Sequence, residues 1–189
     1  RVVVTDGGHF IGWANMYWSV ASPDRMMMVG TAFQSIGQGW PSVVGAALAR
    51  RESTVVLTSG DGGGLMAIAD LESAVRAAGG RGMAVVWNDA AYGAEVNLYG
   101  LKGLAEEPML IPQVHFAGVA RGFGAEGVVV AHAQRLADVM EQRRGVEGGV
   151  ARLAPGVLKD LQGVVEGVAF GVVARVLRDA VEGRDEVDE

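Results

Sequence analysis

Two oxygen-bearing side chains lie at the ends of short apolar runs that resemble strands. Asp61 lies in Gly60-Asp61-Gly62 after one run, and Asn88 ends the next run, separated from Gly62 by 25 residues. Because neighbouring parallel strands lie about 4.8 Å apart, their carboxyl ends can hold both side chains near one point. Carboxylate and amide oxygens suit Mg²⁺, and the glycine loop between the runs offers backbone N–H groups to phosphate. The spacing therefore predicts a magnesium–diphosphate site.

The same segment also fits a dinucleotide site. Gly62-x-Gly64-x-x-Ala67 follows a strand-like run and opens a helical pattern, and Asp89 lies about 20 residues further on, as in the Ala-terminated Rossmann fingerprint. A nicotinamide-dependent oxidoreductase is therefore the alternative function for this part of the chain.

These residues require an α/β framework, and the hydrophobic periodicity predicts one. Strands are expected at 2–5, 55–58, 83–87 and 127–130, with a short apolar run at 26–29, and helices at 11–19, 41–50, 65–78, 113–121 and 134–143. Alternating strands and helices are typical of an α/β fold with a parallel sheet and helices on both faces. Residues 92–103 are expected to form a loop or a short helix.

Four glycine-bearing or proline-bearing motifs follow one another within residues 2–140. They are Thr5-Asp-Gly-Gly-His9 with Trp13-Ala14, Ser35-Ile-Gly-Gln-Gly-Trp-Pro41 with Gly45-Ala-Ala-Leu-Ala49, the Gly60–Gly62 motif with Asn88, and the segment 112–125. In this order they resemble the C-terminal, diphosphate-binding domain of thiamine-diphosphate (ThDP) enzymes of the acetolactate synthase-like family. The resemblance uses Asp61, Asn88 and the two earlier motifs, which the dinucleotide interpretation leaves without a role.

The resemblance implies a function for each matching residue. Mg²⁺ would be held by side-chain oxygens of Asp61 and Asn88 and by the backbone carbonyl of Ala90. Gln34 would offer its backbone carbonyl to the 4′-amino group of ThDP, and Ile36 would support the bent shape of the cofactor. His9 either reaches the diphosphate or is a solvent-facing loop histidine. The implied cofactor-binding residues are Gly8, His9, Gln34, Ile36, Gly60, Asp61, Gly62, Gly63 and Asn88.

The resemblance also implies a lyase or transferase that acts on 2-oxo acids such as pyruvate. In that family a glutamate on a separate pyrimidine-binding domain activates the cofactor, and no part of this chain resembles that domain, so no catalytic residue is assigned. We expect a fragment of a longer polypeptide or a subunit of a split enzyme, inactive alone and part of a homo-oligomer. A non-catalytic ThDP-fold module is a further alternative.

Composition excludes several other functions. The 189 residues are 50% apolar and carry a formal charge of −6, which fits a globular domain and argues against nucleic-acid binding. The absence of cysteine excludes disulfides and thiolate chemistry. We find no apolar run of about 20 residues and no signal peptide, so no membrane span is expected and a cytoplasmic location is favoured.

The family resemblance ends near residue 145. We therefore expect residues 1–145 to form the diphosphate-binding domain and residues 146–189 to form a divergent C-terminal region. Within that region, 148–155 weakly resembles a strand, and apolar residues at 165, 168, 172, 176 and 180 predict a helix within 157–181. The charged end, 182–189, has no assigned function.

Overall fold

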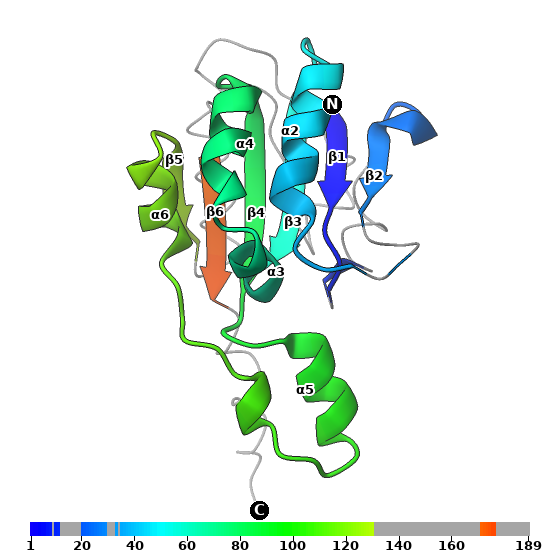
Figure 1. The fold of residues 1–189 in the computed structure, drawn as a ribbon, viewed down its shortest axis with the longest axis vertical. Coiled ribbons are helices and arrows are strands. Elements are labelled where there is room, and N and C mark those ends of the chain that lie inside the picture. The colour runs from blue at the N-terminus through cyan, green and yellow to red at the C-terminus, as the bar shows by residue number, and fades with distance from the viewer. Residues whose placement is uncertain (9, 12–19, 30–32, 34, 131–170, 177–189) are drawn as a thin grey trace, which may run out of the picture.

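The computed structural model describes residues 1–8, 10–11, 20–29, 33, 35–130 and 171–176, and within them a six-stranded parallel sheet forms the centre of the fold (Figure 1). The strand order is β2-β1-β3-β4-β6-β5. The strands are β1 (Val2–Thr5), β2 (Met26–Met28), β3 (Val55–Gly60), β4 (Gly82–Asn88), β5 (Glu126–Val129) and β6 (Gly171–Val176). The helices are α2 (Gly39–Ala49), α3 (Asp61–Met66), α4 (Asp70–Ala78), α5 (Gly93–Gly100) and α6 (Phe116–Gly122), with 3-10 turns η1 (Pro23–Arg25) and η2 (Glu107–Met109). The predicted α/β fold with a parallel sheet is confirmed.

The main core lies between one face of the sheet and helices α2, α4 and α6. Alternate residues of β1, β3 and β4 share a buried cluster with Trp40, Leu71 and Phe116. The residues between them in these strands, including Val3 and Val56, are also buried. Burial on both faces explains why these strands are nearly continuous apolar runs rather than alternating ones.

The predicted helix at 65–78 is wrong in its extent. The chain forms two helices here, because α3 already begins at Asp61 and the backbone leaves helical geometry at Ala67, where φ is −124° and ψ is 34°. Three consecutive glycines give α3 little intrinsic stability, so contacts with the rest of the fold hold it. The indole Nε1 of Trp40 donates a hydrogen bond to the Gly64 carbonyl at 3.0 Å, and the Phe116 ring packs closely against position 64, where an added Cβ would lie 3.2 Å from it.

The helix predicted within 157–181 is also wrong for residues 171–176, which form β6 in parallel between β4 and β5. Val172 and Val173 are adjacent, and consecutive valines suit a central parallel strand. The helix prediction considered only apolar residues at helical spacing and therefore did not use this adjacency. The helices expected at 11–19 and 134–143 and the strand at 148–155 lie outside the described residues, except for residue 11.

The connections place a topological switch point at the carboxyl edge of the sheet. From β1 the chain passes to β2 on one side, and β3 then returns to the other side of β1. Open α/β sheets bind ligands at such a point, beyond the carboxyl ends of the strands. In Figure 1, α5 and η2 form a lobe beyond this edge, which we call the α5 lobe (residues 92–110). None of the helices in the described part of the chain is long and apolar enough to cross a membrane.

Candidate functional site

Asp61 and Asn88 lie at neighbouring strand ends, as their spacing predicts. The parallel register pairs Gly60 of β3 with Trp87 of β4, so the next residues along the two strands are Asp61 and Asn88. Both side chains are buried, with only 2% and 3% of their surfaces exposed. A carboxylate and a carboxamide thus meet at the carboxyl edge beside the switch point.

The Asp61 carboxylate is held by backbone N–H groups from two segments. Its Oδ1 accepts a hydrogen bond from Gly62 N at 2.9 Å, and its Oδ2 accepts one from Ala90 N at 2.7 Å. Burial, the largest cause, and the nearby Asp89 charge together raise the pKa of Asp61 from its usual value of 3.8 to about 6, although the two N–H donors act in the opposite direction. A cation at this position would favour the ionised form and reverse the shift.

Asn88 has a fixed orientation and an unused oxygen. Its Nδ2 donates a hydrogen bond to the Val114 carbonyl at 2.8 Å, which fixes the amide plane. Its Oδ1 is buried, and no described residue donates a hydrogen bond to it. Because a buried polar atom without a partner is costly, this oxygen fits a ligand for a bound cation.

Ala90 adopts a backbone conformation that is uncommon for a residue with a side chain. Its φ is +58°, in the left-handed region, while its N–H contacts Asp61 and its carbonyl accepts a hydrogen bond from Ile111 N at 2.9 Å. The second lone pair of that carbonyl is not used by this hydrogen bond. Short antiparallel pairing of Ala91 with Leu110 joins the two ends of the α5 lobe next to the site.

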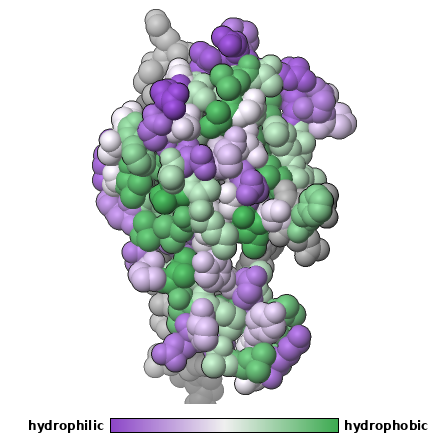
Figure 2. All heavy atoms as spheres, viewed as in Figure 1, coloured by the Kyte–Doolittle hydropathy of each residue, from purple (hydrophilic) through white to green (hydrophobic). Residues whose placement is uncertain are grey.

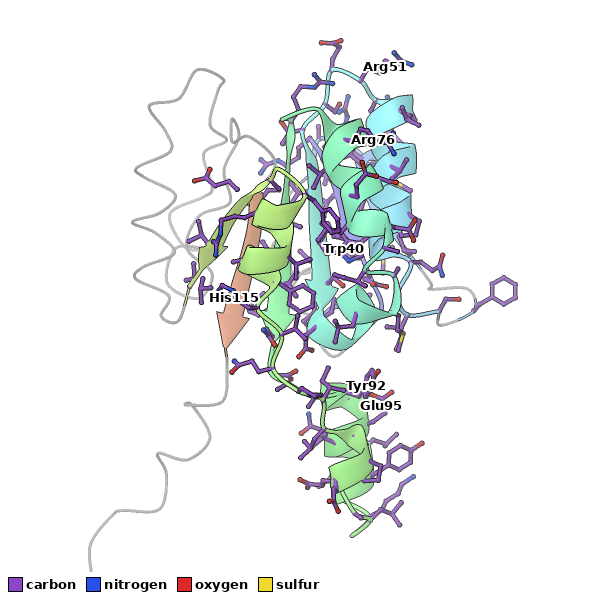
Figure 3. All side chains as sticks on the ribbon, turned by 60° about the vertical axis from the view of Figure 1, so that its left-hand side comes forward. Trp40, Arg51, Arg76, Tyr92, Glu95 and His115 are labelled. Atoms are coloured by element: carbon purple, nitrogen blue, oxygen red, sulfur yellow. The ribbon has the colours of Figure 1, made fainter. Side chains whose placement is uncertain are left out.

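Tyr92 and Glu95 lie where the α5 lobe meets the carboxyl edge of the sheet (Figure 3). The Tyr92 ring packs against Gly62, since a Cβ added at Gly62 would lie 2.6 Å from Tyr92 Cε1. Glu95 is half-buried in the first turn of α5. Gly62 therefore has a packing reason to be glycine, separate from any approach to a ligand.

The two earlier motifs also reach this edge. Ile36 contacts both loops, because a Cβ at Gly7 would lie 3.3 Å from its Cγ1 and a Cβ at Gly63 would lie 3.1 Å from its Cγ2. Gly8 has a φ of +147° and lies beside the Phe10 ring, which also lies close to Gly60. His9 and Gln34 lie outside the described residues, so their predicted roles stay predictions.

Sequence reasoning did not single out Asp6, Ser59 or Val114, which all contact site residues. Asp6 and Ser59 had one visible signal: each is a polar residue at the carboxyl end of an apolar strand, where a parallel sheet places its functional groups. The role of Val114 depends on a contact that no spacing reveals. In the described part of the chain, no three His, Cys, Asp or Glu side chains form a metal-binding group.

Comparison with known proteins agrees with this geometry. Residues 6–151 match the model of the thiamine pyrophosphate enzyme C-terminal TPP binding domain, where TPP is the same compound as ThDP. The chain belongs to this family. ThDP is therefore the cofactor of this domain type, with Mg²⁺ as its usual partner metal, and the family assignment favours ThDP over the dinucleotide alternative.

Related proteins place the domain among acetolactate synthase-like enzymes. The chain is 32% identical over 144 residues to an acetolactate synthase of Bacillus subtilis, covering 76% of this chain and 25% of that protein. It is 32% identical over 142 residues to a sulfoacetaldehyde acetyltransferase of Castellaniella defragrans, covering 73% and 22% respectively. The chain thus spans about a quarter of the length of these curated relatives.

A solved structure shows the same fold. Benzoylformate decarboxylase from Polynucleobacter necessarius matches with a TM-score of 0.67 at 18% identity, over 93% of this chain and 30% of that one. At this identity the likeness supports the fold alone.

Proposed function

We propose that this chain is the diphosphate- and Mg²⁺-binding part of a ThDP-dependent lyase or transferase that acts on 2-oxo acids. One observation carries the proposal: at the switch point, a buried carboxylate with a raised pKa adjoins a buried amide oxygen that has no partner among the described residues. Both features are unfavourable without a cation and are relieved by one.

Asp61 Oδ and Asn88 Oδ1 would hold the metal, with the Ala90 carbonyl as the third protein ligand. Mg²⁺ usually takes few protein oxygens and completes its shell with phosphate oxygens and water. Gly8, Gly60, Gly62 and Gly63 would line the diphosphate, and Ile36, in contact with Gly7 and Gly63, would support the rest of the cofactor. His9 and Gln34 complete the proposed set.

When bound, ThDP supplies the nucleophilic carbon that adds to a 2-oxo acid and accepts the electron pair released by decarboxylation. The contribution of this chain would be to bind and orient the diphosphate end at the carboxyl edge of the sheet, where Asp61 and Asn88 are buried. One curated relative is named an acetolactate synthase and the other an acetyltransferase, and transfer of an acyl group derived from a 2-oxo acid is the proposed reaction class.

The missing part of the site would be a pyrimidine-binding domain, from the same polypeptide or from another subunit. The described residues of α5 are all at least partly exposed, and large apolar side chains face solvent there, including Leu98 (52% exposed) and Leu101 (90%). In Figure 2 the α5 lobe, at the foot of the view, carries apolar residues interspersed with polar ones. Exposed apolar patches next to a site mark docking surfaces for a partner.

Calorimetric titration of ThDP, with and without Mg²⁺, tests the proposal. We expect Mg²⁺-dependent binding, and Asp61→Ala should weaken its affinity by more than about a hundredfold. Replacing residues that only support metal ligands already lowers metal affinity by about 10–100-fold. Asp24→Ala is the matched control, because Asp24 is an exposed aspartate of η1 that pairs with Arg50. This variant should bind ThDP with wild-type affinity. Equal affinity of wild type and Asp61→Ala would contradict the proposed site.

A second assay separates a catalytic part from a non-catalytic module. Exchange of the thiazolium C2 proton of ThDP for deuterium, followed by NMR, should stay slow with this chain alone and accelerate when a pyrimidine-binding domain is added. Fast exchange with the isolated chain would mean that an activating group is present within it.

A further inference from the structure

Asp6 is the most deeply buried acidic side chain that the structure describes, and it lies outside the residues proposed to touch metal or cofactor. It follows β1 directly, and 0% of its surface is exposed. Its backbone N–H donates to the Thr58 carbonyl at 2.9 Å and so continues the pairing of β1 with β3. Among the described residues it forms no ion pair, and its charge must be compensated by hydrogen-bond donors.

Those donors come from three separate segments. From the loop after β1, Gly7 N donates to Oδ1 at 2.8 Å. From the segment before α2, Gly37 N lies 3.0 Å from Oδ1 and 3.2 Å from Oδ2, and Gln38 N lies 3.3 Å from Oδ1. From the end of β3, the Ser59 hydroxyl lies 3.2 Å from Oδ2 and 3.0 Å from the Gly60 carbonyl, so the two acceptors share its one proton. One carboxylate thus joins residues 7, 37–38 and 59.

Two glycines allow the backbone of neighbouring segments to approach the Asp6 carboxylate closely. A Cβ at Gly63 would lie 2.8 Å from Asp6 Oδ2, and a Cβ at Gly39 would lie 3.1 Å from the same atom. Gly63 belongs to α3 and Gly39 to α2, so both helices begin against this side chain. A side chain at position 63 would therefore displace the Asp6 carboxylate or the start of α3.

We propose that Asp6 is a positioning residue whose carboxylate holds the loop after β1 and the segment before α2 against the end of β3, so that the cofactor-binding segments are assembled before the cofactor arrives. The consequence of this proposal for ThDP binding rests on the function proposed above. The assembly of the segments, in contrast, does not depend on any ligand. A rigid, pre-assembled site avoids an ordering cost on binding.

Asp6→Asn is the direct test, because asparagine keeps the size of the side chain and loses the charge and part of its capacity to accept hydrogen bonds. The first measurement is amide hydrogen exchange of the ligand-free full chain. We expect exchange at Gly7, Gly37 and Gln38 to rise by about tenfold or more, as loss of charged hydrogen bonds implies. Amides in the middle of β3 and β4 should change far less, and the control Asp24→Asn should change none of these.

Two results would overturn the proposal. Unchanged exchange at the three amides would mean that Asp6 does not hold them, and an equal rise across β3 and β4 would mean that Asp6 supports only global stability. If Asp6→Asn does not fold, Ser59→Ala removes a single donor to Oδ2 and should raise exchange at the same amides to a smaller extent.

The second measurement is the affinity for ThDP in the presence of Mg²⁺. Asp6→Asn should weaken it by about tenfold or more, while the variant's residual binding remains Mg²⁺-dependent. If the wild-type chain binds ThDP and Asp6→Asn binds it with the same affinity, the role of Asp6 in cofactor binding is overturned. Lack of binding by the wild type itself would instead refute the proposed function, and the exchange measurement would still decide whether Asp6 assembles the segments.

Discussion

The backbone N–H of Ala90 donates a hydrogen bond to Oδ2 of Asp61 at 2.7 Å, joining the loop after β4 to the residue that follows β3. Asp61 is therefore held by the same loop that would supply the third metal ligand in the proposed site. Even with this donor, burial and the charge of Asp89 keep the pKa of Asp61 raised to about 6. The site thus carries a free-energy cost without a cation, and this cost has a measurable dependence on pH.

The stability of the ligand-free chain should fall as pH rises from about 4 to 6 through the contribution of Asp61. Its folded pKa is about 6 and its usual value is 3.8, so in this window the folded state binds more protons than the unfolded state. Stability then decreases with rising pH and levels off above the folded pKa. Urea denaturation of wild type and Asp61→Asn at pH 4.5 and 7 isolates this contribution. Identical pH dependence in both proteins would contradict it.

Mg²⁺-dependent ThDP binding should show the opposite trend. A carboxylate must lose its proton to bind a metal, so affinity should fall by up to about tenfold for each pH unit below about 6. Asp89→Asn removes a neighbouring negative charge and should move this decline to lower pH. Titrations at fixed Mg²⁺ between pH 5 and 8 measure both effects, and a decline at the same pH in wild type and Asp89→Asn would count against the charge of Asp89 as a cause.

Gly62 and Tyr92 should be energetically coupled. Gly62 lies in α3, where alanine is favoured by about 1 kcal/mol, but its Cβ would lie 2.6 Å from the Tyr92 ring. Gly62→Ala should therefore destabilise the wild type and become neutral or stabilising in Tyr92→Ala, with a coupling of about 0.5–3 kcal/mol. Gly45→Ala, in α2 with nothing within 4 Å, is the control and should stabilise by roughly 0.5–1 kcal/mol. Additive effects in the double variant would refute the contact.

Ala90 should tolerate glycine and reject valine. Its φ of +58° is accessible to glycine without steric cost, whereas a β-branched residue is a clear outlier there. Ala90→Gly should leave stability within about 1 kcal/mol of wild type, and Ala90→Val should destabilise by more than about 1 kcal/mol. Chemical denaturation measures both, and valine equal to alanine would show that the left-handed conformation is not required.

The sequence was informative where function follows a strand end and less so where contacts join distant segments. The proximity of Asp61 and Asn88 could be predicted because each follows or ends an apolar run, and parallel pairing of β3 with β4 places the ends of these runs side by side. Asp6 lies in a quoted motif, but its partners are 31, 32 and 53 residues away, so no local pattern shows that one carboxylate joins them.

The two errors of fold have a similar origin. No helix-breaking residue marks the break at Ala67 between α3 and α4, and the nearby hydrogen bond from Trp40 to the Gly64 carbonyl joins segments that no local pattern connects. Strand β6 was assigned as helix because Val172 and Val176 fit a helical stripe, while pairing with β4 and β5 is determined by the rest of the sheet. Short apolar segments are ambiguous for this reason.

The α5 lobe should be part of the surface that contacts a pyrimidine-binding domain. Leu101 is 90% exposed at the end of α5, beyond the carboxyl edge where the cofactor would lie. Leu101→Asp should weaken association with a pyrimidine-binding domain of a related acetolactate synthase by about tenfold or more, a typical effect of losing an apolar contact residue.

Leu48→Asp is the matched control: Leu48 is 56% exposed near the far end of α2, and the variant should associate like wild type. Analytical ultracentrifugation with and without ThDP–Mg²⁺ measures both variants, and ligand that contacts both domains should strengthen association. Equal affinity for Leu101→Asp and Leu48→Asp would exclude this end of the α5 lobe from the interface.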